Sequence, residues 1–327
     1  MRSITRVAVV GVDHWHAEMH INALKEAGRE IVGVSAQREE AADQWGTRLG
    51  CPVWADLHRL VEETQPDFVV AMAQHADLAA VGGFLLQTGI PFAIEKPLGL
   101  NSDQVAPLAE VARRKRSFAA VPLVNRYSPI WQHVDALRSS GRLGDIAHAH
   151  FRIINGPPSR YNSYGVPWML DPVTSGGGSL RNLGVHVVDA FLYLTGEDVE
   201  IVGSDIGFKL YGKPVEEFAT AILRSTSGVI GTIEAGYTFA SMSDGDYEWR
   251  IATAGAYLID RAGELSVFTL DAEPVRFSTP PLQERYRDFM VDTLSRAEQG
   301  AAPIASIEDC YRAMHVIDKI YLWASRG

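Results

Sequence analysis

Phe92-Ala93-Ile94-Glu95-Lys96-Pro97-Leu98 is an apolar run that stops at an acid, a base and a proline. Its short apolar part is typical of a buried parallel strand. Because Pro97 cannot donate a hydrogen bond to a neighbouring strand, the strand is predicted to end at Glu95-Lys96. Lys96 then lies at the carboxyl end of a strand, where open α/β sheets bind ligands, and burial there would lower its pKa enough for proton transfer. An isolated Glu-Lys-Pro also fits an ordinary surface lysine, so the context has to decide.

The segments around this stretch alternate between apolar strands and helices. Over about 120 residues this alternation predicts a doubly wound parallel sheet, an α/β fold with right-handed crossovers. The predicted strands are Arg6–Gly11, Ile31–Val34, a short one around Val53, Phe68–Ala71, the strand ending at Glu95-Lys96, and Phe118–Val121. The predicted helices are Ala17–Ala27, Glu39–Leu49, Leu57–Thr64, Leu78–Thr88 and Ser102–Lys115.

The rhythm changes after Pro122, where strands follow one another with few helices between them. This pattern predicts an α+β second domain with a mainly antiparallel sheet. We therefore expect a first domain over 1–122 and a second over 123–327, with closing helices from about 283. The predicted strands here are Ile146–Ile154, Ile201–Phe208, Phe218–Leu223, Val229–Tyr237, Glu248–Ala252 and Ala256–Asp260. The predicted helices are Ile130–Ser139, one from Gly176-Gly177-Gly178 to about Leu194, Gln283–Gln299 and Ile307–Ala324.

Composition narrows the class of protein. The chain has 327 residues, of which 46% are hydrophobic, enough for two domains with large cores. A net charge of -10 argues against nucleic acid or an anionic membrane as partner. The two cysteines, Cys51 and Cys310, show no metal-type spacing, and no stretch approaches a membrane span, so we predict a cytoplasmic protein.

Four motifs occur in order along the chain: the strand-turn-helix unit at Gly11, Glu95-Lys96-Pro97, Asn125-Arg126-Tyr127-Ser128-Pro129, and the segment from Gly176-Gly177-Gly178 to Asp189. In this combination the chain resembles the glucose-fructose oxidoreductase / inositol dehydrogenase / MocA (Gfo/Idh/MocA) family. The resemblance implies a Rossmann domain that carries NAD or NADP, and a second domain whose open sheet forms a homo-oligomer, a dimer or tetramer. It also implies hydride transfer at a carbinol of a sugar, cyclitol or related polyol.

The resemblance implies that Lys96 and His186 are the catalytic pair. Lys96 would bind the substrate hydroxyl and lower its pKa, while His186 would take or relay the proton. Asn182 stands where the family usually has an aspartate, and on one helix it would reach His186 across an i,i+4 step. Its amide can orient the ring but cannot balance the charge of an imidazolium. Asp189, whose default interpretation is a structural carboxylate, could supply that charge.

The cofactor turn departs from the dinucleotide fingerprint. Of its glycines only Gly11 is kept in Gly11-Val12-Asp13-His14-Trp15-His16. Asp13 is predicted to cap the following helix, where its carboxylate would repel a phosphate by about 4 kcal/mol at about 4 Å unless it turns away. His16 could offset this by donating to a phosphate.

The other predicted cofactor contacts follow the second, fourth and fifth strands. No acid follows the second strand to bind the 2′-hydroxyl of NAD, and its polar residues could instead accept the 2′-phosphate of NADP, so the sequence slightly favours NADP. Arg38 could also merely begin the next helix. The predicted cofactor-binding residues are Gly11, Asp13, His14, Trp15, His16, Ser35, Gln37, Arg38, Ala73, Gln74, His75, Glu95 and Lys96.

A metal site is not predicted. His16 and His20 have a workable two-ligand spacing on a helix, but the glutamate of a His-Glu-x-x-His motif is missing. Substrate contacts are expected from an aromatic ring and hydrogen-bonding side chains, which suit a polyhydroxylated ring, although each of them could equally serve packing. The predicted substrate-binding residues are Lys96, Arg126, Tyr127, Trp168, Arg181, Asn182 and His186.

Two alternatives to an NAD(P)-dependent dehydrogenase stay open from the sequence. One is a glycoside-cleaving enzyme of the same fold, in which bound NAD transiently oxidises the sugar. The other is a non-catalytic binding protein with a degraded dinucleotide site, suggested by Asp13, His16 and Ala73-Gln74-His75.

Overall fold

The computed structural model describes residues 3–326 and divides into two compact units. The first unit contains Met1–Val124, Asn162–Met169 and Leu282–Tyr311, and the second contains Asn125–Tyr161, Leu170–Pro281 and Arg312–Gly327. Two segments that the sequence grouped with the second domain, 162–169 and 282–311, thus belong to the first unit. Helix α10 (Leu282–Gln299) does so because it packs along α1 (Ala17–Glu26).

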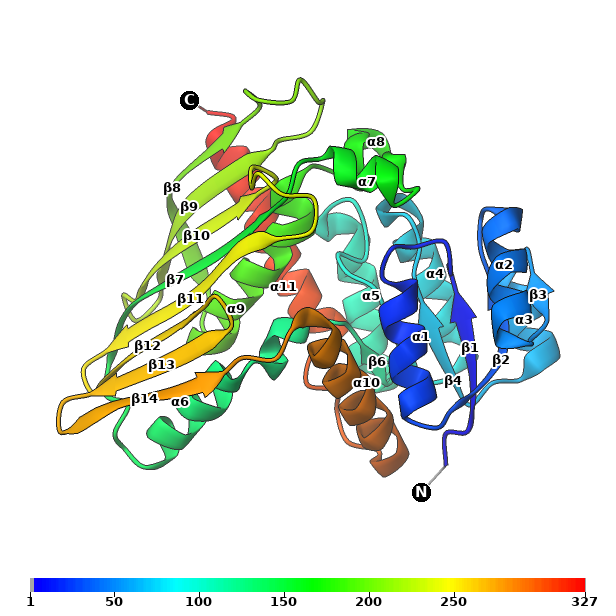
Figure 1. Ribbon diagram of the computed structural model, residues 1–327, viewed down its shortest axis with the longest axis horizontal. Helices are drawn as coiled ribbons and strands as arrows, with labels where there is room; N and C mark the ends of the chain where they lie inside the picture. The colour runs from blue at the N-terminus through cyan, green and yellow to red at the C-terminus, as the bar shows by residue number, and fades with distance from the viewer. Residues whose placement is uncertain (1–2, 327) are drawn as a thin grey trace. The chain divides into compact units, whose positions relative to one another are not determined.

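The sheet of the first unit confirms the predicted parallel fold. Its strands lie in the order β3-β2-β1-β4-β5-β6, and every pair is parallel. This is the Rossmann order, in which the strand order reverses between β1 and β4 at the ligand-binding switch point (Figure 1). The strands are β1 (Arg6–Val10), β2 (Glu30–Ser35), β3 (Val53–Trp54), β4 (Phe68–Ala71), β5 (Phe92–Ile94) and β6 (Ala119–Ala120).

Helices connect these strands, as the alternating pattern predicts. Helix α4 begins at His75, one turn earlier than the predicted Leu78, and so carries His75 into the helix. The side chains of β1, β4 and β5 are almost wholly buried, which explains their uninterrupted apolar sequence. The helices between the strands are α1, α2 (Glu39–Leu49), α3 (Leu57–Thr64), α4 (His75–Thr88) and α5 (Ser102–Lys115).

The second unit contains a mainly antiparallel sheet, as predicted, and its strands lie in the order β14-β13-β12-β11-β7-β10-β9-β8. Within this sheet, as residues 3–326 describe it, only the pair formed by β7 and β10 is parallel. The strands β13 and β14 were not predicted. The bounds are β7 (Ile146–Asn155), β8 (Val199–Gly207), β9 (Phe218–Ser225), β10 (Ile230–Gly236), β11 (Gly245–Thr253), β12 (Ala256–Arg261), β13 (Glu264–Thr269) and β14 (Ala272–Ser278).

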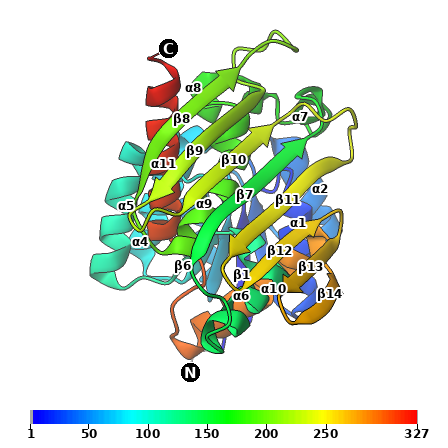
Figure 2. The ribbon, with the colours of Figure 1, turned by 90° about the vertical axis from the view of Figure 1, so that its left-hand side faces the viewer.

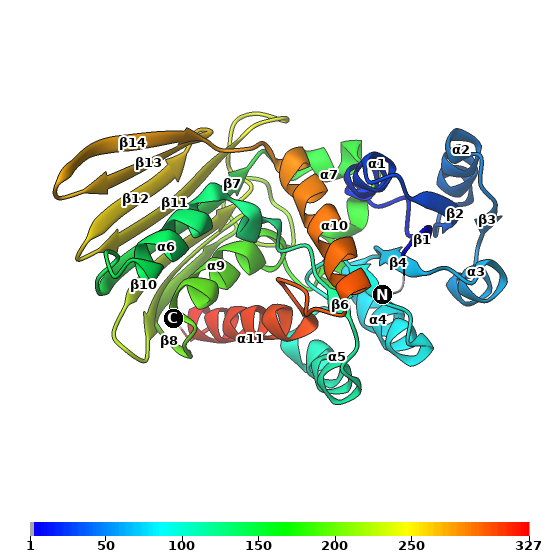
Figure 3. The same ribbon diagram turned by 90° about the horizontal axis from the view of Figure 1, so that it is seen from below.

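One face of this sheet is covered by helices and the other is open. Helices α6 (Pro129–Ser139) and α9 (Val185–Thr195) pack on one face, and the strands lie unobstructed in front on the other (Figures 2 and 3). Within residues 3–326, none of the helices combines the length and apolar character that crossing a bilayer requires. The remaining elements are η1 (Val124–Tyr127), α7 (Ser159–Ser163), η2 (Pro167–Leu170), α8 (Pro172–Ser175), the π-helical turn η3 (Leu180–Gly184) and α11 (Ile307–Ala324).

Candidate functional site

Gly11 ends β1 at the switch point of the first sheet. Its φ of +76° favours glycine, and a Cβ added there would lie 1.9 Å from the carbonyl oxygen of Met72. The backbone nitrogens of Gly11 and Val12 donate to the carbonyl of Ser35, at 2.8 and 3.0 Å. The turn after β1 is therefore held against the ends of β2 and β4, and the one glycine kept from the fingerprint is required by this geometry.

A pocket of about 360 Å³ opens beside this turn, and segment 165–168 forms its remaining wall. Its position outside the carboxyl ends of β1, β2 and β4 is where dinucleotide-binding sheets hold their ligand. Of the predicted cofactor residues, those that line the pocket are Gly11, Asp13, His14, Ser35, Gln37, Arg38, Ala73 and Gln74.

Asp13 does not cap the following helix, so that part of the sequence prediction is wrong. Helix α1 begins at Ala17, and its N-cap is His16, which makes no side-chain capping bond. The Asp13 carboxylate instead accepts a hydrogen bond from the Arg38 backbone nitrogen at 3.3 Å and lies 3.7 Å from the Arg38 Nε. The Asp13 carboxylate thus faces Arg38, which follows β2, and the Arg38 guanidinium partly neutralises its negative charge.

Polar side chains form a hydrogen-bonded chain along the pocket wall that follows β2 and β4. Gln74 donates to the Gln37 side-chain oxygen at 2.8 Å, and Gln37 donates to an Asp77 carboxylate oxygen at 2.6 Å. The Arg38 side chain is 55% exposed and lies beside Gly165. Arg38 is therefore the cation in this wall that a ligand phosphate could reach.

Trp168, which we expected to contact substrate, lies in the first unit and lines this pocket. Its ring centroid is 5.1 Å from that of His75, 5.7 Å from that of Trp15 and 6.4 Å from that of His14. His14 in turn stacks on Trp15 at 3.8 Å. Segment 162–169 thus adds an aromatic wall to the pocket, a contribution that the strand pattern does not reveal.

Lys96 follows β5 and is buried, with 2% of its surface exposed. Burial lowers its pKa from the ordinary 10.5 to about 8, although the charge of Glu95 acts in the opposite direction. A lysine of this kind can both accept and return a proton near neutral pH. The sequence interpretation of Glu95-Lys96-Pro97 as more than a surface turn agrees with this burial.

Glu95 and His16, both expected at the cofactor, instead contact each other in a buried cluster. Glu95 Oε1 lies 3.0 Å from His16 Nδ1, 2.9 Å from His20 Nε2 and 3.2 Å from the Tyr286 hydroxyl. The His16 ring is therefore engaged by protein groups, which argues against its predicted phosphate contact. Tyr286 was missed because it lies on α10, 191 positions from Glu95, and no local motif marks it.

His186 and Asn182 lie in the second unit and are both buried. Residues 180–184 form a π-helical turn, so the α-helical i,i+4 geometry assumed for the pair does not apply. The Asn182 amide nitrogen donates to the hydroxyls of Tyr161, at 2.8 Å, and Tyr237, at 3.1 Å. These tyrosines were not predicted, because they lie 21 and 55 positions from Asn182 and no local motif links them to it.

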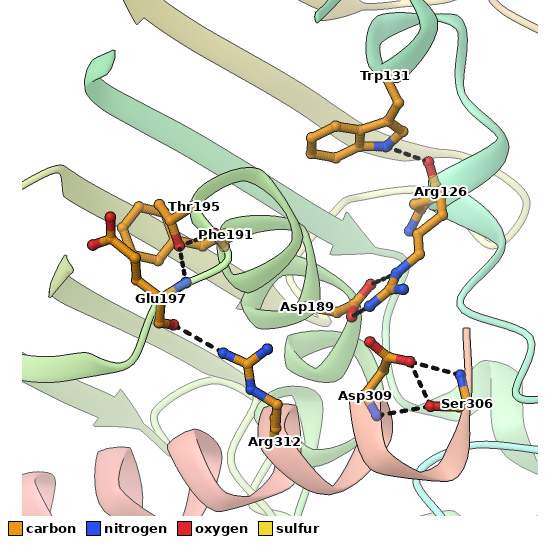
Figure 4. A network of polar contacts seen from close by, with 10 residues as sticks. Arg126, Trp131, Asp189, Phe191, Thr195, Glu197, Ser306, Asp309 and Arg312 are labelled. Carbon is orange, nitrogen blue, oxygen red and sulfur yellow. Dashed lines mark hydrogen bonds and ion pairs between the residues drawn. The ribbon is translucent and has the colours of Figure 1, made fainter. Parts of the chain in front are cut away.

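Arg126 forms a buried ion pair with Asp189. Its Nε and one terminal nitrogen donate to the two carboxylate oxygens at 3.0 and 2.6 Å (Figure 4). The guanidinium also lies 4.4 Å from the Tyr193 ring centroid. The side chains are 5% and 3% exposed. This pairing argues against Arg126 as a substrate ligand and against Asp189 as a counter-charge for His186, because each already balances the other.

Arg181 is likewise engaged by protein groups. It donates to an Asp318 carboxylate oxygen at 2.7 Å and to the Gly176 carbonyl oxygen at 3.3 Å, and it is 3% exposed. The structure therefore gives Arg181 a role in fixing α11 and the glycine-rich turn.

Tyr127, which was also predicted to contact substrate, lies at the end of η1 and is half-buried.

Two histidines of the first unit, His14 and His16, are shifted towards the neutral form by burial. Burial, with the neighbouring His16 second, lowers the pKa of His14 well below its ordinary value. Burial also lowers the pKa of His16, although Glu95 opposes the shift. Across residues 3–326, no three His, Cys, Asp or Glu side chains are grouped to hold a metal ion.

Two models of one protein family match the chain. The model of the oxidoreductase family with an NAD-binding Rossmann fold matches residues 5–122, and that of the GFO/IDH/MocA C-terminal domain matches residues 131–256. The chain therefore belongs to the Gfo/Idh/MocA family of NAD-binding oxidoreductases, which confirms the resemblance seen in its motifs.

Relatives with named activities are similar to this chain. Myo-inositol 2-dehydrogenase of Thermotoga maritima is 25% identical, over 93% of this chain and 91% of that protein. Trans-1,2-dihydrobenzene-1,2-diol dehydrogenase of Oryctolagus cuniculus is 25% identical over 65% of this chain. The chain spans between 52% and 62% of the length of that enzyme and of two further relatives.

Solved structures share the fold at low identity. An inositol dehydrogenase homolog from Azotobacter vinelandii, complexed with NAD+, has a TM-score of 0.87 at 16% identity and covers 100% of this chain and 97% of that one. Levoglucosan dehydrogenase, in complex with NADH and levoglucosan, also has a TM-score of 0.87 at 16% identity, covering 98% and 97% of the two chains. At this identity the likeness establishes the fold alone.

Proposed function

We propose that this protein is an NAD(P)-dependent oxidoreductase that transfers a hydride to or from a carbinol of a sugar, cyclitol or related polyol. The observation that carries the proposal is Lys96, a buried lysine with a pKa of about 8 that lies two residues after β5, in the same unit as the switch-point pocket. The named activities of the inositol and dihydrodiol dehydrogenases support this substrate class.

The residues that line the pocket are compatible with a dinucleotide at the turn after β1, where the fingerprint glycines normally lie. Gly11 packs directly against the Met72 carbonyl oxygen and presents no side chain at the turn, and the Asp13 carboxylate is held by Arg38. Gly11, Gln37, Arg38 and Gln74 would hold the dinucleotide, with Trp168 as an aromatic wall. Because Ser35 ends β2 where NAD sites carry an acid, and Arg38 is accessible, we propose NAD or NADP with a slight preference for NADP.

When bound, the nicotinamide supplies the group that accepts or releases the hydride. In the oxidation direction the neutral Lys96 amine accepts a hydrogen bond from the substrate hydroxyl and takes its proton as the C–H bond breaks. We propose that His186 then relays this proton onward. Asn182, which donates to the hydroxyls of Tyr161 and Tyr237, helps to fix the helix that carries His186.

The test is to incubate the protein with NAD or NADP and a panel of cyclitols, sugars and diols. Hydride transfer is detected as an increase in the absorbance of the reduced cofactor. Lys96→Met should leave cofactor binding intact and lower turnover by about 10²–10⁴-fold, the usual contribution of a positioned acid-base group. Lys25→Met, at an exposed position on α1, is the control and should change neither. Normal turnover by Lys96→Met would contradict the role of Lys96.

A non-catalytic binding protein is the second candidate, supported by Asp13 and His16 at positions where the fingerprint has glycine. It predicts that the chain turns over none of the compounds with either dinucleotide. The glycoside-cleaving alternative predicts released aglycone without a net change in cofactor absorbance. A cytoplasmic location stays a prediction from the sequence.

We also propose a homo-oligomer, a dimer or tetramer, formed through the open face of the second sheet. The strands of this sheet alternate between buried and exposed side chains, yet several of the exposed ones are large and apolar. Such a group of apolar side chains is unusual for a surface in contact with water. The side chains are Val202, Ile222, Ile230, Tyr247, Tyr257 and Phe268. Light scattering should report more than one chain for the wild type. Ile222→Glu should dissociate it, whereas Leu270→Glu, 87% exposed in the turn after β13, should not.

A further inference from the structure

Glu95 makes three close polar contacts through a single oxygen. His20 on α1, His16 at the N-cap of α1 and Tyr286 on α10 all approach Oε1, at 2.9, 3.0 and 3.2 Å. The other oxygen, Oε2, is buried and has no hydrogen-bond partner within residues 3–326. Glu95 itself is 1% exposed. A buried carboxylate held on one side only differs from an ordinary structural acid, whose two oxygens are usually both satisfied.

The protons of this cluster can be placed from the distances. His20 Nδ1 is buried without a hydrogen-bond partner in the described chain, so the proton of a neutral ring belongs on Nε2, which donates to Glu95. The Tyr286 hydroxyl donates to Glu95. The Tyr286 oxygen lies 2.8 Å from His16 Nδ1. The N–H at that nitrogen can therefore donate to both the Tyr286 oxygen and the Glu95 carboxylate. Two imidazole rings and a phenol thus surround one carboxylate oxygen.

The pKa directions agree with this arrangement. Burial alone would raise the pKa of Glu95, but its contacts with His16 and His20 outweigh burial and hold that pKa well below the ordinary value. Burial raises the pKa of Tyr286 well above its ordinary value, and Glu95 adds to the shift, so the phenol keeps its proton. The charge on Glu95 is therefore permanent near neutral pH.

We propose that Glu95 is a positioning residue: His16, His20 and Tyr286 hold its carboxylate as a fixed anion next to Lys96 in the chain, and this anion sets the protonation of the lysine. The catalytic use of Lys96 rests on the proposed function, whereas the electrostatic coupling does not. The charge of Glu95 raises the pKa of Lys96 and opposes the effect of burial. The Cys310 thiol donates to the Pro97 carbonyl oxygen at 3.4 Å.

The one-sided contacts of Glu95 provide a clean substitution. In Glu95→Gln the amide oxygen can replace Oε1 and accept from all three donors, while the amide nitrogen takes the place of Oε2. The variant therefore removes the charge and keeps the hydrogen bonds. Without the anion, burial is opposed less strongly, so the pKa of Lys96 must fall.

The first experiment measures Lys96 directly by NMR of protein labelled with ¹³C-lysine, with the Lys96 signal assigned by its loss in Lys96→Met. The wild-type signal should titrate with a midpoint of about 8. In Glu95→Gln the midpoint should fall by about one pH unit or more. A midpoint that does not move, or that rises, would overturn the proposal. Circular dichroism checks that the variant is folded.

The second experiment tests the network with Tyr286→Phe. This variant should change the midpoint of Lys96 when residue 95 is Glu and leave it unchanged in the Glu95→Gln background. An equal shift in both backgrounds, or none in either, would contradict a role through Glu95. Tyr321→Phe is the control, since the Tyr321 hydroxyl also donates to a buried glutamate, Glu216, at 2.7 Å in the second unit. It should not alter the midpoint of Lys96.

Turnover separates this inference from the proposed function. If the wild type oxidises a polyol, its pH–rate profile should move with the Lys96 midpoint in Glu95→Gln, and a profile that stays in place would refute the coupling to catalysis. If no polyol is turned over, the proposed function fails. The NMR midpoints then decide the electrostatic coupling alone.

Discussion

Replacing Asp189 by asparagine should destabilise the second unit strongly, because it leaves the Arg126 guanidinium buried without its counter-charge. The two charge-assisted hydrogen bonds, at 3.0 and 2.6 Å, lie between side chains that are 5% and 3% exposed. Breaking a buried pair of this kind by removing one partner costs about 3–5 kcal/mol. With a urea m-value of about 3 kcal/mol per molar, the unfolding midpoint should fall by about 1–2 M.

The double variant Arg126→Met/Asp189→Leu should recover most of this loss. Apolar replacement removes both desolvation penalties together with the attraction, so its net effect is small. The contact between the Arg126 guanidinium and the Tyr193 ring is also lost, at a cost of about 1–2 kcal/mol. We therefore expect the double variant to unfold within about 2 kcal/mol of the wild type.

Urea unfolding followed by tryptophan fluorescence and circular dichroism measures these differences. Glu200→Gln is the control, because Glu200 pairs with Arg224 at 3.1 Å but is 64% exposed, and such pairs contribute little. A loss below about 1 kcal/mol in Asp189→Asn would refute the interpretation of a buried, mutually dependent pair. So would a double variant as unstable as the sum of the two single ones.

Three further predictions concern the first unit. Trp168→Ala should weaken cofactor binding measured by fluorescence titration, because it removes one wall of the pocket, whereas Trp323→Ala, in the second unit, should not. The rate of polyol oxidation should rise with pH through about 8 and then level off, since Lys96 must be neutral to accept the proton. The rate of the reverse reaction should fall through the same range. A flat kcat/KM profile would contradict this role of Lys96. Gly11→Ala should lower both the thermal midpoint and cofactor affinity, because its Cβ would lie 1.9 Å from the Met72 carbonyl oxygen; unchanged values would refute this packing.

Local pattern was sufficient to predict most of the fold. Strands such as Phe68–Ala71 are uninterrupted apolar runs because both faces of a parallel sheet are covered, and this makes them easy to recognise. The edge strand Ala272–Ser278 was missed because nearly all of its side chains are exposed, so no alternation marks it. Likewise, sequence order alone could not show that 162–169 belongs to the first unit.

The candidate site was predictable where one local motif carries the chemistry. Gly11 follows β1 and Lys96 lies two residues after β5, and the structure gives each the local setting expected of it, a glycine-only turn and a buried lysine. The ion pairs of the arginines could not be foreseen, because the partners are distant in sequence: Asp189 lies 63 positions from Arg126. From the sequence alone, a charged side chain is interpreted as available for ligands, because its ion-pair partner is visible only in the folded structure.

The central claim is that the switch-point pocket of the first unit binds a nicotinamide dinucleotide, and titration with NADH and NADPH tests it most directly. Nicotinamide fluorescence should change with saturation for at least one of the two, and Arg38→Ala should weaken NADPH more than NADH, because Arg38 is the accessible cation of the pocket wall. No binding of either dinucleotide at millimolar concentration would contradict the claim.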